Sequence, residues 1–317
     1  MKKILFASTA LVATASVAAA ELTWSGSGRF GLVYNEGHTT DTVVDHRFRL
    51  TVNGVAETDG GVKFEGRIRW QADDTGGSKN ATGATGNEND NGAGAASAGG
   101  AGFAVSTGGF RLDVGNVSDV FDSGDVINWG GYGVGYTGFL DQAANFTGFN
   151  KAGFGNSAEN QQTLKARYTA GDFTVAASYT LEDNALPAVA ANDDYWQVGA
   201  GYSFGAHKVG AMYGDSGDNI SQWAVGADGS FGDFAYAVLV GDNDAAADLM
   251  WGLSGSYAVS AAGTLTAFVS DGGAAGADTS YGIGYAHSLG GGVTIAAGVG
   301  SNTAGNTQAD AGVKFNF

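Results

Sequence analysis

The segment KFEGRIRWQ, residues 63–71, switches between two kinds of side chain from one residue to the next. Successive side chains of a β-strand point to opposite faces, so this segment is expected to be a strand. One face would carry Lys63, Glu65, Arg67, Arg69 and Gln71, and the other Phe64, Gly66, Ile68 and Trp70. The segment HRFRLTVN, residues 46–53, repeats the pattern. Such faces fit either a soluble antiparallel sheet or the wall of a membrane barrel, and the rest of the chain has to decide.

The first twenty residues are expected to be a secretory signal peptide that is removed. Lys2 and Lys3 form a positively charged start, residues 4–18 are apolar, and the three alanines at 18–20 form a cleavage signal. The alternative, a short membrane anchor, fits less well because the apolar stretch is brief. The mature chain would begin at Glu21, and the signal peptide would direct the protein out of the cytoplasm. It contains no cysteine for disulfide bonds or thiolate metal sites.

The last six residues, GVKFNF, also alternate and stop at an aromatic residue. A strand that ends in phenylalanine, here Phe317, resembles the assembly signal of bacterial outer-membrane barrels. After residue 20 the sequence has no apolar run long enough for a membrane-spanning helix. Together with the signal peptide, these features favour a barrel over a soluble sheet.

The composition limits the classes of partner and fold. The mature chain would carry 15 − 2 = 13 basic and 32 acidic residues, a formal charge of −19. This excess of acid argues against nucleic acid as a partner. With 55 glycines and one proline, the sequence suits neither long helices nor a disordered linker. No linker separates two cores, so residues 21–317 are expected to form one domain.

Sixteen strands are predicted, at 21–34, 44–55, 61–71, 101–107, 109–115, 162–169, 172–182, 194–204, 207–214, 220–230, 232–241, 248–258, 262–270, 278–288, 292–300 and 308–317. Tight turns and longer polar connectors take turns along the chain, as they do in outer-membrane barrels. The centre of such a barrel must be a channel, because sixteen strands enclose more space than side chains can fill. Phe64, Ile68 and Trp70 would then face lipid and Arg67 and Arg69 the water-filled lumen. Each Arg or Lys turned toward the bilayer centre would cost about 2–4 kcal/mol.

Two connectors are unusually long. Residues 72–100 form a low-complexity segment rich in Gly, Ala and Asn. Residues 116–161 far exceed the usual loop length and are rich in aromatic side chains, including Phe121, Trp129 and Tyr136. This second loop is too aromatic to float in water and too acidic to face lipid. We therefore expect it to fold into the lumen.

In the order and spacing of several segments, the chain resembles the general-diffusion porins of alphaproteobacteria, of the Rhodobacter type. These segments are ELTWSGSGRFGLVYN at the mature start, HRFRLTVNG followed by TDGGVKFEG, FRLDVGNVSDVFD followed by GYTGFLD, and the terminal GVKFNF. The resemblance implies an all-β fold: a 16-stranded antiparallel transmembrane β-barrel in the outer membrane, with residues 116–161 as its inward-folded third external loop. It also implies a homotrimer in outer-membrane lipid and passive diffusion of small hydrophilic solutes and ions. The longer glycine-rich segment 72–100 departs from the family.

The resemblance also implies the residues of a channel constriction. Its basic wall would consist of Arg29, Arg47, Arg49 and Arg67, with Arg69 and Arg111 nearby, and its acidic side of Asp119, Asp122, Asp125 and Asp141. The uneven distribution of charge agrees, because residues 209–313 contain no Lys or Arg. The alternative is that these residues simply form a solvated surface.

Other functions are weighed against the porin. The sequence shows no convincing Ser/His or Asp/His pair for catalysis, and no cofactor is expected. A Ca²⁺ site at Asp119, Asp122 and Asp125 stays open, although their spacing is not that of an EF-hand loop. The alternatives to a general porin are a substrate-selective channel and a non-conducting surface adhesin. The net charge predicts a modest preference for cations, which the arginine wall would oppose.

Overall fold

The computed structural model describes residues 21–73, 96–143, 146–149, 151–155, 162–181, 194–215 and 220–317. The predicted signal peptide, residues 1–20, lies outside the described residues, as does most of the segment 72–100. Among the described residues, no helix is long and apolar enough to cross a membrane.

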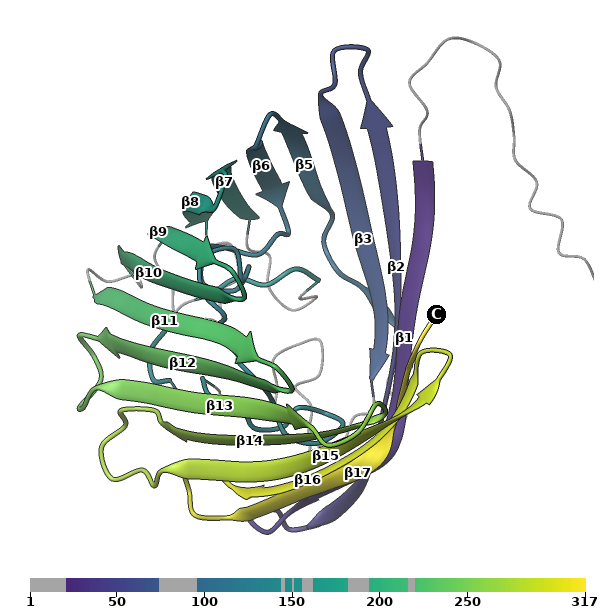
Figure 1. The fold of residues 1–317 in the computed structure, drawn as a ribbon, viewed down its shortest axis with the longest axis vertical. Helices are drawn as coiled ribbons and strands as arrows, with labels where there is room; N and C mark the ends of the chain where they lie inside the picture. The colour runs from purple at the N-terminus through teal and green to yellow at the C-terminus, as the bar shows by residue number, and fades with distance from the viewer. Residues whose placement is uncertain are drawn as a thin grey trace, which may run out of the picture.

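All regular structure in the described residues is β-structure (Figure 1). The strands are β1 Glu21–Asn35, β2 Thr42–Glu57, β3 Lys63–Asp73, β4 Ser97–Ala98, β5 Gly102–Thr107, β6 Phe110–Gly115, β7 Gln162–Ala170, β8 Phe173–Leu181, β9 Tyr195–Phe204, β10 His207–Asp215, β11 Ser221–Phe231, β12 Phe234–Asn243, β13 Met250–Ala258, β14 Gly263–Asp271, β15 Ser280–Gly290, β16 Val293–Ser301 and β17 Thr307–Asn316. The short β4 and β5 both pair with β3 and form one interrupted strand. The seventeen segments therefore make a ring of sixteen strands, which confirms the predicted number.

The ring is closed by its first and last strands. β1 pairs antiparallel with β2 on one side and with β17 on the other. Phe317 extends this last pairing, because its N–H donates to the Gly26 carbonyl and its own carbonyl accepts from the Gly26 N–H. Figure 1 shows the C-terminus beside β1. Closure removes the free sheet edges that a membrane would not tolerate.

The two faces of the predicted strand 63–71 lie as expected. Phe64 is 51% exposed and Trp70 38% exposed on the outside of the barrel, while Arg67 and Arg69 are half-buried on the inside. Large exposed apolar side chains recur on the outward faces of the other strands, for example Phe103 on β5 and Ile283 on β15. The outer surface thus suits lipid, and the charged residues line the lumen.

The two-residue turns all lie at one end of the barrel and the longest connectors all lie at the other. The connectors 58–62, 108–109, 171–172, 205–206, 232–233, 259–262 and 291–292 join the strands at one end, where residues 21 and 317 also lie, because Glu21 pairs with Val55 beside the first of these turns. The longer connectors, including 116–161, all leave the opposite end. Counted from the start of the chain, 116–161 is the third of these, as predicted.

Candidate functional site

Residues 116–155 leave β6 and run along the inside of the barrel instead of over its rim. Their backbone N–H groups donate to side chains on the inner faces of distant strands. Val120 donates to Ser178 Oγ at 3.3 Å, and Phe121 donates to Gln197 Oε1 at 3.1 Å. Further along, Tyr132 N–H donates to Ser254 Oγ at 2.9 Å. In Figure 1 this part of the chain lies within the space that the strands enclose. The loop is therefore folded inward.

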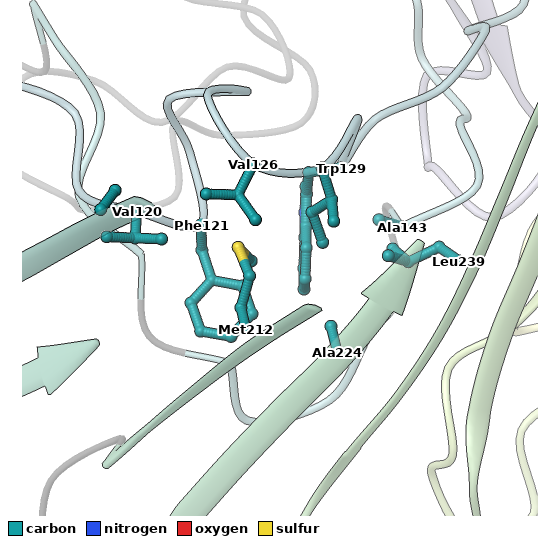
Figure 2. Close-up of a cluster of buried hydrophobic side chains, with 10 residues drawn as sticks. Val120, Phe121, Val126, Trp129, Ala143, Met212, Ala224 and Leu239 are labelled. Atoms are coloured by element: carbon teal, nitrogen blue, oxygen red, sulfur yellow. The ribbon is translucent and has the colours of Figure 1, made fainter. Parts of the chain in front are cut away.

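An apolar cluster fixes the middle of the loop to the wall. Phe121 and Trp129 pack edge to face, with ring centroids 5.2 Å apart, and both are buried. Figure 2 shows the loop side chains of this cluster packed against Met212, Ala224 and Leu239, which point inward from β10, β11 and β12. Burying this apolar and aromatic surface stabilises the loop on this side of the lumen.

A row of buried, uncharged polar side chains accompanies the apolar cluster. Seven strands from β8 to β15 contribute one each, namely Ser178, Gln197, Gln222, Asn243, Ser254, Ser270 and Ser280. Several of them bind the loop, as Asn243 does by donating to the Gly148 carbonyl at 2.7 Å. This row was not predicted from the sequence, because isolated Ser, Asn and Gln residues carry no recognisable spacing.

The tip of the loop is held by Asp310 on β17. A bridge between Val134 and Leu140 closes the tip. The Asp310 carboxylate accepts the N–H groups of Tyr136 and Thr137 at 3.1 and 2.8 Å and the Thr137 hydroxyl at 2.6 Å. Gly135 has a φ of 80° and lies so close to Asp310 that a Cβ atom would collide with the carboxylate. Asp310, on the inward face of the last strand, was not among the predicted site residues either.

Asp119 does not lie on the acidic side of a constriction, where it was predicted. Its side chain is fully buried. Its carboxylate accepts hydrogen bonds from the N–H groups of Asp122 and Ala152, from the Tyr195 hydroxyl and from Gln197 Nε2, at 2.6–3.1 Å. Burial raises the pKa of Asp119 to about 6, and the hydrogen bonds oppose that rise. All four contacts come from donors, and together they tie both arms of the loop to β9.

Asp125 is also occupied, in this case by cations of β7. Lys165 Nζ lies 2.7 Å from its Oδ2, and Arg167 binds its Oδ1. Burial alone would raise the pKa of Asp125, but the hydrogen bonds and charges of these two cations outweigh it and lower the pKa. Asp125 thus fixes the loop to the wall, and little of its charge is left to act on a solute.

Of the four predicted acids, Asp122 is the one whose side chain is exposed, and it has no ion pair among the described residues. Asp141 is half-buried, and its Oδ1 accepts the Ala143 N–H at 2.8 Å. In the part of the chain that the structure describes, no group of three His, Asp or Glu residues gathers as metal ligands. Asp119 and Asp125 are instead surrounded by their hydrogen-bond donors and cations.

Three of the predicted basic residues are paired with acids of their own wall. Arg29 lies 2.8 Å from Asp45, and Arg47 binds Asp73 on the neighbouring strand. Arg111 binds both Glu65 and Asp113. These pairs keep the arginines on the inner face of β1, β2 and β6 and largely cancel their charges.

The other three, Arg49, Arg67 and Arg69, have no ion pair among the described residues. Arg49 binds the Gln71 amide oxygen. The Arg67 and Arg69 guanidinium carbons lie 3.7 and 4.6 Å from the centre of the Phe154 ring. Arg69 also donates to the Phe154 carbonyl at 3.0 Å. Phe154, at the end of the loop, therefore joins the loop to the basic wall.

The open lumen lies between this wall and the loop. The structure brings the six predicted arginines together on β1, β2, β3 and β6, and the loop covers the wall from β8 round to β17. The four predicted acids are spread along the loop and have different surroundings. Asp122 alone combines exposure with the lack of an ion pair within the described ranges.

Comparison with known proteins gives consistent matches over nearly the whole chain. A family model described as Gram-negative porin matches residues 7–307. The porin of Fuscovulum blasticum is 30% identical over 307 residues, covering 94% of this chain and all of that protein. Among solved structures, a mutant of the Rh. blastica porin superposes with a TM-score of 0.75 at 30% identity. A triple mutant of the Rhodopseudomonas blastica porin gives 0.73 at 28%, and both cover 94% of this chain and all of theirs.

Proposed function

The chain belongs to the Gram-negative porin family, and we propose that loop 116–161 makes its channel a filter for size and charge. The protein is an outer-membrane porin, through which small hydrophilic solutes diffuse passively. The relatives that match it are porins, which are channels and not enzymes.

The inward course of the loop is the observation that supports the filter. The loop takes up space along more than half of the inner wall, while arginines remain along β1 to β3. A narrow, water-filled gap between charged walls orients polar solutes and lets them exchange their hydration water. Apolar solutes gain nothing from the field and lose water contacts. Passage would then depend on size and charge, without a binding pocket for uncharged solutes.

Neutral sugars of graded size test the filter in proteoliposomes. We expect swelling rates that fall smoothly as the sugar grows and that rise linearly with sugar concentration. Saturation of the rate at millimolar sugar would indicate a substrate-selective channel instead. If planar bilayers show no conductance after the protein has inserted, the result would indicate a non-conducting barrel.

We further propose a homotrimer in outer-membrane lipid. The support is the family resemblance, together with an outward face of β16 that carries only small or apolar residues, Ile295, Ala297 and Val299 among them. Flat apolar faces of this kind can pack against another copy of the chain as well as against lipid.

Native mass spectrometry of the porin released gently from detergent should show three chains. An Ile295→Arg substitution on the outward face of β16 should favour the single chain, because a guanidinium would be buried between copies. Observation of a monomer with normal conductance for the unaltered protein would exclude the trimer and leave the channel intact.

A further inference from the structure

The unpaired charges of the constriction have opposite signs and different numbers. Arg49, Arg67 and Arg69 lack ion pairs among the described residues, whereas Asp122 is the exposed acid without one. The three arginines lie on the β2–β3 ladder, where Arg49 is opposite Gln71, Arg69 opposite Thr51 and Arg67 opposite Asn53. They therefore form one continuous strip on the inner wall.

We propose that Arg49, Arg67, Arg69 and Phe154 form an anion station, which makes the channel favour small anions with a carboxylate or phosphate group. This inference rests on the proposed filter and names the class of solute that the filter favours. The net charge of the mature chain predicts the opposite sign, a preference for cations. The location of the charges decides between the two.

The charge near the strip has a small positive excess. The charges that act on it come from six arginines, at 29, 47, 49, 67, 69 and 111, and five carboxylates, at 45, 65, 73, 113 and 122, which gives 6 − 5 = +1. Four of those carboxylates are bound to Arg29, Arg47 or Arg111. Other acids, such as Asp59 and Asp278, lie in connectors at the two ends of the barrel, and salt screens charges beyond about 10 Å at 0.1 M.

Phe154 gives the strip its geometry. Its ring lies against Arg67 and Arg69, which covers one face of each planar guanidinium. Stacking of this kind leaves the in-plane N–H groups free to bind oxygen atoms, and a guanidinium fork matches the two oxygens of a carboxylate or phosphate. Arg69 uses one of its N–H groups on the Phe154 carbonyl. Phe154 is thus a positioning residue that comes from the loop and acts on the opposite wall.

The test is ion preference in planar bilayers with the complete mature porin. From the reversal potential in a KCl gradient, we expect a chloride-to-potassium permeability ratio above one. The triple variant Arg49→Gln, Arg67→Gln and Arg69→Gln changes the local sum from +1 to −2. Its chloride-to-potassium permeability ratio should be below one and at least about threefold lower than that of the wild type. A unit charge about 6 Å away in water changes the occupancy of a site by an ion by about that factor.

The matched control is Lys63→Gln on the same strand, where Lys63 is 51% exposed and pairs with Glu57. It should leave the ratio unchanged.

Inorganic phosphate tests the positioning by Phe154. Millimolar phosphate should lower the KCl conductance of the wild type, and this block should weaken in the arginine triple variant. Phe154→Leu should weaken the block while keeping the chloride preference, because the charges remain.

A chloride-to-potassium permeability ratio that is the same in the wild type and the arginine triple variant would overturn the station, although the size filter would stand. An undiminished block in Phe154→Leu would overturn the positioning role.

Discussion

Replacing residues 130–141 by a Gly-Ser turn should roughly double the single-channel conductance, because conductance follows the open cross-section of a water-filled pore. The deletion removes the part of the loop that covers the wall from β13 to β17. The two arms meet just before this part, since Gln142 Nε2 donates to the carbonyls of Asn128 and Trp129 at 2.9 and 3.1 Å. A short turn can therefore join them, and the cluster around Phe121 and Trp129 stays in place.

The same variant should admit sugars that the wild type excludes, and swelling of proteoliposomes measures this directly. The ring of sixteen strands loses none of its pairings, so the folded barrel should still withstand detergent electrophoresis without heating. An Asp310→Asn variant is the matched smaller change, because it weakens the bonds to Tyr136 and Thr137 without removing any chain. It should give a noisier current with a mean conductance between those of the wild type and the deletion. Unchanged conductance and size cutoff in the deletion would show that the tip does not narrow the channel.

The ring of strands could be predicted from the sequence because its signal is local. Residues 63–71 alternate in polarity, and each strand repeats some version of that alternation between turn residues. The inward course of the loop could be predicted by elimination, because its aromatic and acidic residues suit neither open water nor lipid. A more direct signal was present in the strands that the loop covers. β10 and β12 place Met212 and Leu239 on the inner face although their outer faces are also apolar. A barrel strand that is apolar on both faces needs a cover on the inside.

The pairing of charges could not be predicted in the same way. Asp125 is bound by Lys165, which is 40 positions away, and Asp119 by Gln197, which is 78 positions away. The family resemblance gives the acids one common role, whereas the fold gives them three. Asp119 and Asp125 fasten the loop, Asp141 caps a turn of it, and Asp122 alone keeps its charge exposed. The predicted preference for cations counted all of these charges as equally free.

Asp119→Asn should loosen the whole inward loop, although the residue never touches a solute. Three donors converge on one carboxylate oxygen, and the Asp122 N–H points at the other. An asparagine amide has one acceptor oxygen and one donor nitrogen, so at least one buried donor loses its partner and faces another N–H group. The cost is about 1–3 kcal/mol. Local opening should therefore become about 10- to 100-fold more frequent, and hydrogen exchange at the Ala152 amide should speed up by that factor.

Asp122→Asn is the matched control, because it makes the same chemical change three residues away on an exposed side chain. It should leave exchange at Ala152 unaltered and shift the reversal potential toward anions, because it removes the exposed negative charge. Asp119→Asn should do the reverse: it should increase exchange and current noise, with little direct effect on the reversal potential while the loop is closed. If exchange at Ala152 is equally slow in both variants, the apolar cluster alone holds the loop. Asp119 would then be a buried acid without an anchoring role.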